Sequence, residues 1–182
     1  WLAGIGSSVD TTKPWNTPAN QQGLKKWRFY SYGKPVVDFH SDSEAVAKEP
    51  EPIPDTNVMA IVGPGTAFGD GNEPPMKLKE LPPQTILIAE VRSSGIPWPA
   101  PGDLDIRTMP ETIDGADGQG ISGAHDGFHV IFADGQVWFL SNSVPFNLLS
   151  RFFTVAEASK HDREKLLAPY VRELGPEPRS FD

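Results

Sequence analysis

The sequence predicts an α+β fold in which a central antiparallel sheet is flanked by short helices and joined by long loops rich in proline and glycine. Two apolar runs surround the dipeptide Asp134-Gly135, an arrangement typical of a β-hairpin. Two further runs, "VMAIV" and "QTILIAEV", are rich in the β-branched and aliphatic residues that strands favour. The 182 residues include 19 prolines and 17 glycines, which favour short elements with turn-rich connections over a helical bundle.

The first half of the chain is expected to form one short helix and three strands. Thr17 is a suitable N-cap and Pro18 suits the first turn of the helix. The strands are recognised by their apolar and β-branched composition and by the glycines and prolines that stop them. These elements are a helix over residues 17–27 and strands over residues 35–39, 58–62 and 84–91.

Two long connections separate these elements. Residues 40–57 are acidic and rich in proline, and are expected to form a loop. Residues 93–123 show no periodic pattern and are expected to be irregular. Connections of that length are uncommon unless they carry a function or cover another part of the protein.

The hairpin around Asp134-Gly135 is expected to use a two-residue loop in a type I′ turn, which needs positive φ at both central residues. That loop pairs Phe132 with Val137 and His129 with Leu140. Both faces of the hairpin are then largely apolar, so the sequence predicts that it is covered on both sides. In this interpretation the hairpin is structural and its histidine is a bystander.

Short helices are expected after the hairpin. Ser143 and Pro145 begin a helix that ends near Phe153. Residues 154–157 read as a capping box that opens another helical turn. Residues 162–174 are expected to be helical, with a break at Pro169.

Composition excludes several classes of function. The net charge of −8, from 24 acidic and 16 basic residues, makes nucleic acid an unsuitable partner. The absence of cysteine excludes disulfides, zinc–thiolate sites and cysteine nucleophiles. The longest apolar runs are far shorter than the roughly 20 residues that span a membrane.

The histidines give no clear catalytic signal. His125 and His129 are four residues apart on a turn and strand, where that spacing separates them by about 13 Å, too far to chelate one metal ion unaided. A structural role is therefore the main interpretation, and no catalytic residue is predicted. The alternative is an acid–base pair of His125 with Asp134, although an aspartate before glycine is more simply a turn residue.

Two other stretches are candidate binding sites. Asp114 and Asp117, in "DGADG", are candidate calcium ligands, but the stretch lacks the distal glutamate of a hand-type loop, and an ordinary Asp-Gly turn is the alternative. Trp98, in the long connection, is a candidate ligand surface, although aromatic residues are more often part of the core. No other cofactor is predicted.

Four segments occur in order along residues 13–154, and together they carry a family resemblance. They resemble a bacterial family that has a prepilin-type N-terminal cleavage and methylation signal and a C-terminal motif of His, nine residues and then Asp-Gly. Its members are described as pseudopilins similar to general secretion pathway protein G, and the domain has no assigned function. The segments are "TTKPWNTPANQQGLKKW", "NVMAIVGPGTAFGDG", "QTILIAEVRSSGIPWPAPGDLDI" and "HDGFHVIFADGQVWFL".

The family motif maps onto His125 and Asp134-Gly135, with Asp126, Gly127 and Phe132 inside it. Residues 126–133 separate His125 from Asp134, one fewer than in the family. The family often has a cysteine near the strand predicted at residues 35–39, and this chain has none. Family members tend to stop soon after the motif, whereas this chain continues.

The resemblance implies a pilin-like globular head over residues 1–154, followed by a C-terminal helical extension and tail over residues 155–182. It implies a non-catalytic structural subunit of a type II secretion or type IV pilus-like system, without a cofactor. The head would lie in the periplasm or at the cell surface, and the partners would be other pilin-like subunits or envelope proteins. A long apolar helix upstream of Trp1 would anchor it in the membrane.

Two other functions are retained as alternatives. An extracytoplasmic module that binds sugar or peptide would use residues 93–123 and Trp98. A hydrolase would use His125 with an aspartate inside a cleft.

Overall fold

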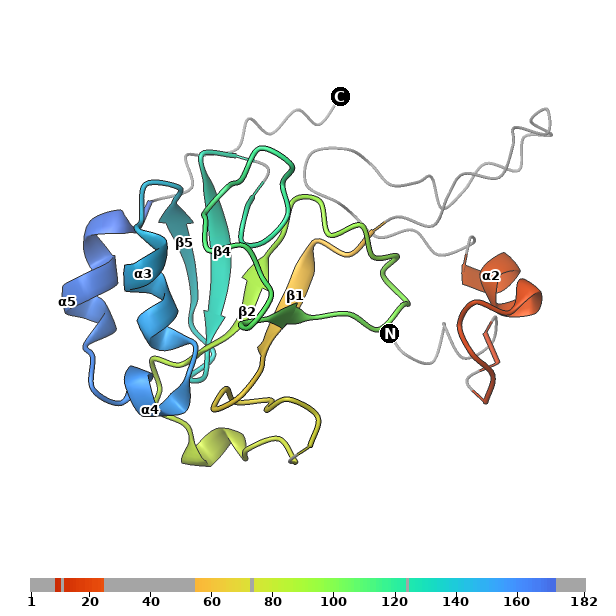
Figure 1. The fold of residues 1–182 in the computed structure, drawn as a ribbon, viewed down its shortest axis with the longest axis horizontal. Helices are drawn as coiled ribbons and strands as arrows, with labels where there is room; N and C mark the ends of the chain where they lie inside the picture. Colours follow the sequence, from red (N-terminus) through yellow and green to blue (C-terminus); the bar gives the residue numbers. More distant parts are fainter. Residues whose placement is uncertain (1–8, 11, 25–54, 73, 124, 173–182) are drawn as a thin grey trace, which may run out of the picture. The chain divides into compact units, whose positions relative to one another are not determined.

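The computed structural model describes residues 9–10, 12–24, 55–72, 74–123 and 125–172 (Figure 1). The chain divides into two compact units. The N-terminal unit comprises Trp1–Asn57 and Gly95–Pro101. The sheet unit comprises Val58–Ser94 and Gly102–Asp182, and it contains every strand described here.

The sheet unit is built on one mixed five-stranded sheet, so the broad α+β prediction is confirmed. The strands lie in the order β3-β1-β2-β4-β5, and all neighbours are antiparallel except β1 and β3. The strands predicted for the central antiparallel sheet correspond to β1, β2, β4 and β5, which do pair antiparallel, and β3, which was not predicted, makes the sheet mixed. The strands are β1 (Val58–Val62), β2 (Ile86–Glu90), β3 (Leu104–Asp105), β4 (Gly127–Phe132) and β5 (Val137–Ser141).

The turn between β4 and β5 differs from the predicted one. Among non-glycine residues described, only Asp114 has positive φ, so Asp134 does not adopt a type I′ turn. Instead the N–H of Gly135 donates to Phe132 O, Gly135 has φ +83°, and the N–H of Phe132 donates to Gln136 O. This is the three-residue loop of a type I turn with a left-handed glycine.

The register is consequently shifted by one residue from the prediction. His129 pairs with Phe139 and Ile131 with Val137, whereas the predicted pairs were His129–Leu140 and Phe132–Val137. A one-residue shift moves every side chain of β5 to the other face of the sheet. The face that carries Phe128, Val130 and Phe132, here the first face, consequently holds the buried side chains. The opposite face, which carries His129 and Ile131 and is here the second face, is only half covered.

The first face of the sheet carries the core. Phe128, Val130 and Phe132 of β4 are fully buried there, together with Leu140 of β5. The guanidinium of Arg163 in α5 lies 4.6 Å from the Phe132 ring centroid, which places α5 on this face. Figure 1 shows α3, α4 and α5 together beside β5.

The helices after the sheet begin close to where they were predicted. Thr154 caps α4, because its hydroxyl accepts the N–H of Glu157 at 3.4 Å. Asp162 caps α5 by accepting the N–H of Lys165 at 3.2 Å. The elements are α3 (Phe146–Leu149), η2 (Ser150–Phe152), α4 (Val155–Ala158), α5 (Arg163–Leu167) and η3 (Ala168–Tyr170), in addition to η1 (Leu78–Glu80) before β2.

The chain after η3 returns to the free edge of β5. Val171 forms an antiparallel bridge with Leu140, and the N–H of Arg172 donates to Phe139 O at 2.9 Å. Leu167 and Ala158 are fully buried, and Gln84 Nε2 donates to Ala158 O at 2.7 Å. Residues 155–172 are thus packed into the same unit as the sheet.

The N-terminal unit contains the predicted helix as α2 (Pro18–Leu24). Thr17 directly precedes it at the predicted N-cap position, where its carbonyl accepts the N–H of Gln21 at 2.8 Å, but its buried hydroxyl makes no hydrogen bond. Asn20 stabilises the unit instead, because its amide accepts the N–H of Asp10 at 2.7 Å and donates to Pro14 O at 3.1 Å. The strand predicted at residues 35–39 lies outside the described residues. In the part of the chain that the structure describes, no helix has the length and apolar character needed to cross a membrane.

Candidate functional site

Two motif residues, Gly127 and Phe132, are structural. Phe132 is fully buried at the end of β4. Gly127 begins β4, and a Cβ added there would lie 2.4 Å from Leu140 O and 2.8 Å from Phe139 Cζ. Such distances leave no room for a side chain, so the glycine allows β4 and β5 to approach at this end of the hairpin.

Asp134 forms a bidentate ion pair with Arg163. Arg163 Nη1 donates to Asp134 Oδ1 at 3.0 Å, and Arg163 Nη2 donates to Oδ2 at 2.5 Å. The guanidinium also donates to Pro83 O and lies 5.1 Å from the Trp138 ring. Hydrogen bonds from Arg163 lower the pKa of the Asp134 carboxyl below its usual value. This aspartate is therefore more than a turn residue, since it connects the hairpin to α5.

The remaining motif residues lie at the other end of β4. His125 is exposed, and its carbonyl accepts a hydrogen bond from Asn142 Nδ2 at 3.4 Å. Asp126 is also exposed, and its carbonyl accepts the N–H of Asn142 at 3.2 Å. Because β4 separates His125 from Asp134, the structure does not bring these two side chains together as the acid–base pair considered above.

The structure pairs a different histidine with a carboxylate. Glu90 of β2 is buried, and its Oε2 accepts the N–H of His129 at 2.9 Å and lies 2.8 Å from His129 Nδ1. The His129 ring also contacts Phe139, with centroids 4.8 Å apart. Sequence reasoning missed this pair, although a glutamate inside an apolar strand signals a buried partner.

The two candidate calcium ligands have protein partners. Asp114 adopts φ +51°; its Oδ1 lies 3.2 Å from Arg92 Nη1, and its Oδ2 accepts from Asn142 Nδ2 at 3.0 Å. Asp117 Oδ1 accepts the N–H of Gln119 in an ordinary turn. Within the described ranges, no three His, Asp or Glu side chains are grouped as metal ligands. A calcium role for this stretch stays a prediction.

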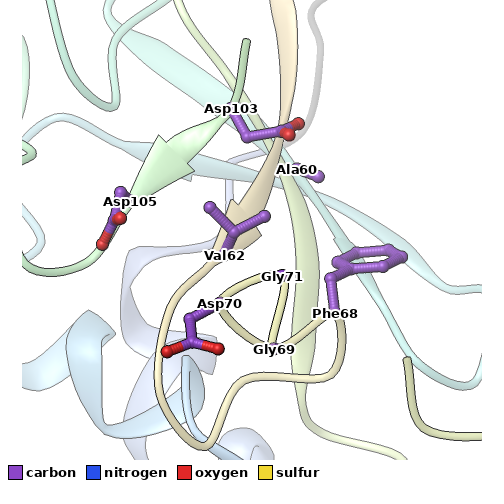
Figure 2. A pocket seen from close by; sticks show the side chains of 8 residues that line it. All are labelled: Ala60, Val62, Phe68, Gly69, Asp70, Gly71, Asp103 and Asp105. Carbon is purple, nitrogen blue, oxygen red and sulfur yellow. The ribbon is translucent and has the colours of Figure 1, made fainter. Parts of the chain in front are cut away.

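The sheet unit has a pocket at the edge formed by β1 and β3, with a volume of about 400 Å³ (Figure 2). Its apolar part comes from Ala60 and Val62 of β1 and from Phe68 in the following loop. That loop is closed by a hydrogen bond of 2.7 Å from the N–H of Gly63 to Gly69 O, which helps to position Phe68. The full lining is Ala60, Val62, Phe68, Gly69, Asp70, Gly71, Asp103 and Asp105.

The three carboxylates of the pocket are not equivalent. Arg107 donates to Asp105 through Nε and Nη2, and its Nη1 lies 3.9 Å from Asp70 Oδ2. The Arg107 side chain and backbone N–H lower the pKa of Asp105 to about 2. Asp103 is exposed, and none of the described residues forms a hydrogen bond or ion pair with its carboxylate. In Figure 2 the carboxylates of Asp103 and Asp105 point away from each other.

Trp98 lies in the N-terminal unit. It is half-buried on a turn in which the N–H of Ala100 donates to Pro97 O at 2.7 Å. The N–H of Thr56 donates to Ile96 O at 2.8 Å, which holds this segment against residues 55–57. Trp98 is not among the residues that line the pocket of the sheet unit.

No protein-family model, curated protein or solved structure matches the chain. The geometry of the described residues and the residues that carry the family resemblance are therefore the grounds for a function.

Proposed function

We propose that this chain is a non-catalytic structural subunit, the exported head of a pseudopilin-like protein in a type II secretion or type IV pilus-like assembly. The observation that carries the proposal is the use of the motif residues in the fold. Asp134 is bound to Arg163, Phe132 is in the core and Gly127 permits close strand packing. These residues serve architecture, so the motif supports a scaffold rather than a reaction centre.

The second face of the sheet supplies a surface for assembly. Directly opposed residues share a face, and the pairing places four apolar side chains in one row across β1, β2, β4 and β5. None of the four is fully buried, and Val137 is 56% exposed. A contiguous apolar row of this kind suits contact with another subunit. The row consists of Ala60, Ile88, Ile131 and Val137.

The coding sequence upstream of Trp1 tests the exported, anchored part of the proposal. We expect it to encode a processing site followed by about 20 apolar residues, because a membrane anchor needs that length. Reading the upstream gene sequence in its source genome is the measurement. An upstream region that encodes no such stretch would remove the anchored pseudopilin from consideration.

Val137→Lys tests the assembly surface. We expect the wild-type chain to self-associate with rising concentration and the variant to remain monomeric, because a charge on the apolar row must be desolvated on contact. Sedimentation velocity over a concentration series measures this. Leu78→Lys is the matched control, since Leu78 is 60% exposed in η1, outside the row. Equal association of the two variants would count against the proposed surface.

A second candidate function, a ligand-binding module, is favoured by the pocket at the β1–β3 edge. Its volume of about 400 Å³ lies within the range of small-molecule sites. It combines apolar walls with three carboxylates, and small-molecule sites commonly pair apolar walls with a few polar groups. The residues involved differ from Trp98, which the sequence favoured for this role.

A further inference from the structure

We propose that the pocket at the β1–β3 edge binds an alkyl chain that ends in a primary ammonium group. This assignment rests on the second candidate function above and names its ligand class. Three features of the lining carry it: one carboxylate without a partner, an aromatic wall and an apolar floor.

The charge of the ligand follows from the carboxylates. Three aspartates line the pocket, and the guanidinium of Arg107 is bound by Asp105 and lies close to Asp70. Asp103 is left without a hydrogen-bond or ion-pair partner among the described residues. The local field is therefore negative, and a cation that enters meets one uncommitted carboxylate.

The apolar part of the ligand follows from the other side chains. Ala60, Val62 and Phe68 are half-buried, so each still presents apolar surface to the pocket. Covering such surface with methylene groups is favourable, by roughly 25 cal/mol per Å² removed from water. An ammonium group over the Phe68 ring would gain a cation–π interaction as well.

Two other cations fit the lining less well. A metal ion needs several grouped oxygen ligands, and the described part of the chain places no three carboxylates together in that way. A guanidinium is bound best by a carboxylate presented for two parallel hydrogen bonds, and Arg107 already occupies Asp105 in this manner. A compact ammonium needs only the single carboxylate of Asp103.

The binding test is an NMR titration of the isotope-labelled chain with n-pentylamine hydrochloride at pH 7. We expect shifts of the backbone amides of Gly69, Gly71 and Asp103. 1-Pentanol, which has the same chain without the charge, should bind at least about threefold more weakly, the factor that a partly exposed ion pair provides. Asp103→Asn should weaken pentylamine binding by a similar factor. Asp117→Asn removes the same charge outside the pocket and should leave the affinity unchanged.

The outcomes separate the ligand class from the site itself. Equal binding of pentanol and pentylamine would overturn the ammonium assignment and leave a ligand pocket. Absence of shifts with either compound would overturn both the ammonium assignment and the ligand pocket. Neither result affects the sedimentation test of assembly. Nα-acetyl-lysine amide distinguishes two sources of the alkylammonium group. If it binds as tightly as pentylamine, the ligand is a lysine side chain of a partner. If it does not bind while pentylamine does, the ligand is a free amine.

Discussion

Gly127→Ala is expected to lower the free energy of unfolding of the sheet unit by about 2–3 kcal/mol. The added Cβ would lie 2.4 Å from the backbone oxygen of Leu140, and backbone atoms cannot move aside as a flexible side chain can. β4 and β5 would have to separate where Gly127 pairs with Ser141. Urea unfolding followed by far-UV circular dichroism measures the loss.

Gly115→Ala is the matched control for this substitution. Its added Cβ would lie 3.3 Å from Asp117 Oδ1 and 3.4 Å from Thr112 Oγ1, which are side-chain atoms that can shift. We expect a change within about 0.5 kcal/mol, as for most surface substitutions. If the two alanine variants unfold at the same urea concentration, the close approach at Gly127 does not determine stability.

Arg163→Ala is expected to destabilise the sheet unit by about 2 kcal/mol, because it removes a buried guanidinium that binds Asp134 through two hydrogen bonds and also donates to Pro83 O. The substitution also removes the guanidinium from the faces of Phe132 and Trp138. Lys165→Ala is the control, since Lys165 lies on the same helix α5 and is exposed. Unfolding midpoints in urea measure both variants.

The pH dependence gives this prediction a second readout. The Asp134 pKa is lowered in the folded protein by Arg163, so the pair stabilises the fold above the unfolded pKa of about 4. That contribution is lost as the pH falls through the folded pKa. The difference in stability between wild type and Arg163→Ala should therefore shrink between pH 7 and about pH 3.

A double-mutant cycle identifies the pair itself. Asp134→Asn keeps the turn hydrogen bond to the N–H of Gln136 and removes the charge. Combined with Arg163→Ala, it should cost less than the sum of the single changes, because each removes the same interaction. Additive costs would show that the two side chains act independently.

The hairpin shows which features of the fold a local sequence pattern predicts and which it does not. The pattern predicted two neighbouring antiparallel strands, and β4 and β5 are paired in this way. It did not predict the register, because a two-residue type I′ loop and a three-residue loop both place glycine at a left-handed position. The structure adopts the second, with Asp134 outside the left-handed region and Gly135 at φ +83°.

The missed features depend on contacts between distant residues. β3 has two residues and pairs in parallel with β1, across a long connection that gave no periodic signal. Arg163 and Asp134 are 29 residues apart, and Glu90 and His129 are 39 apart. The pocket likewise combines the loop after β1 with residues of β3. Local propensity contains no information about which of these segments meet.

The return of the chain to β5 after η3 has a consequence for aggregation. An outer strand with unsatisfied amides and carbonyls is a template on which foreign strands polymerise. Here Val171 forms a bridge with Leu140 and the N–H of Arg172 donates to Phe139 O, so the chain's own residues pair with this edge of β5. Growth from the β5 edge into amyloid-like ribbons is therefore opposed by the fold itself.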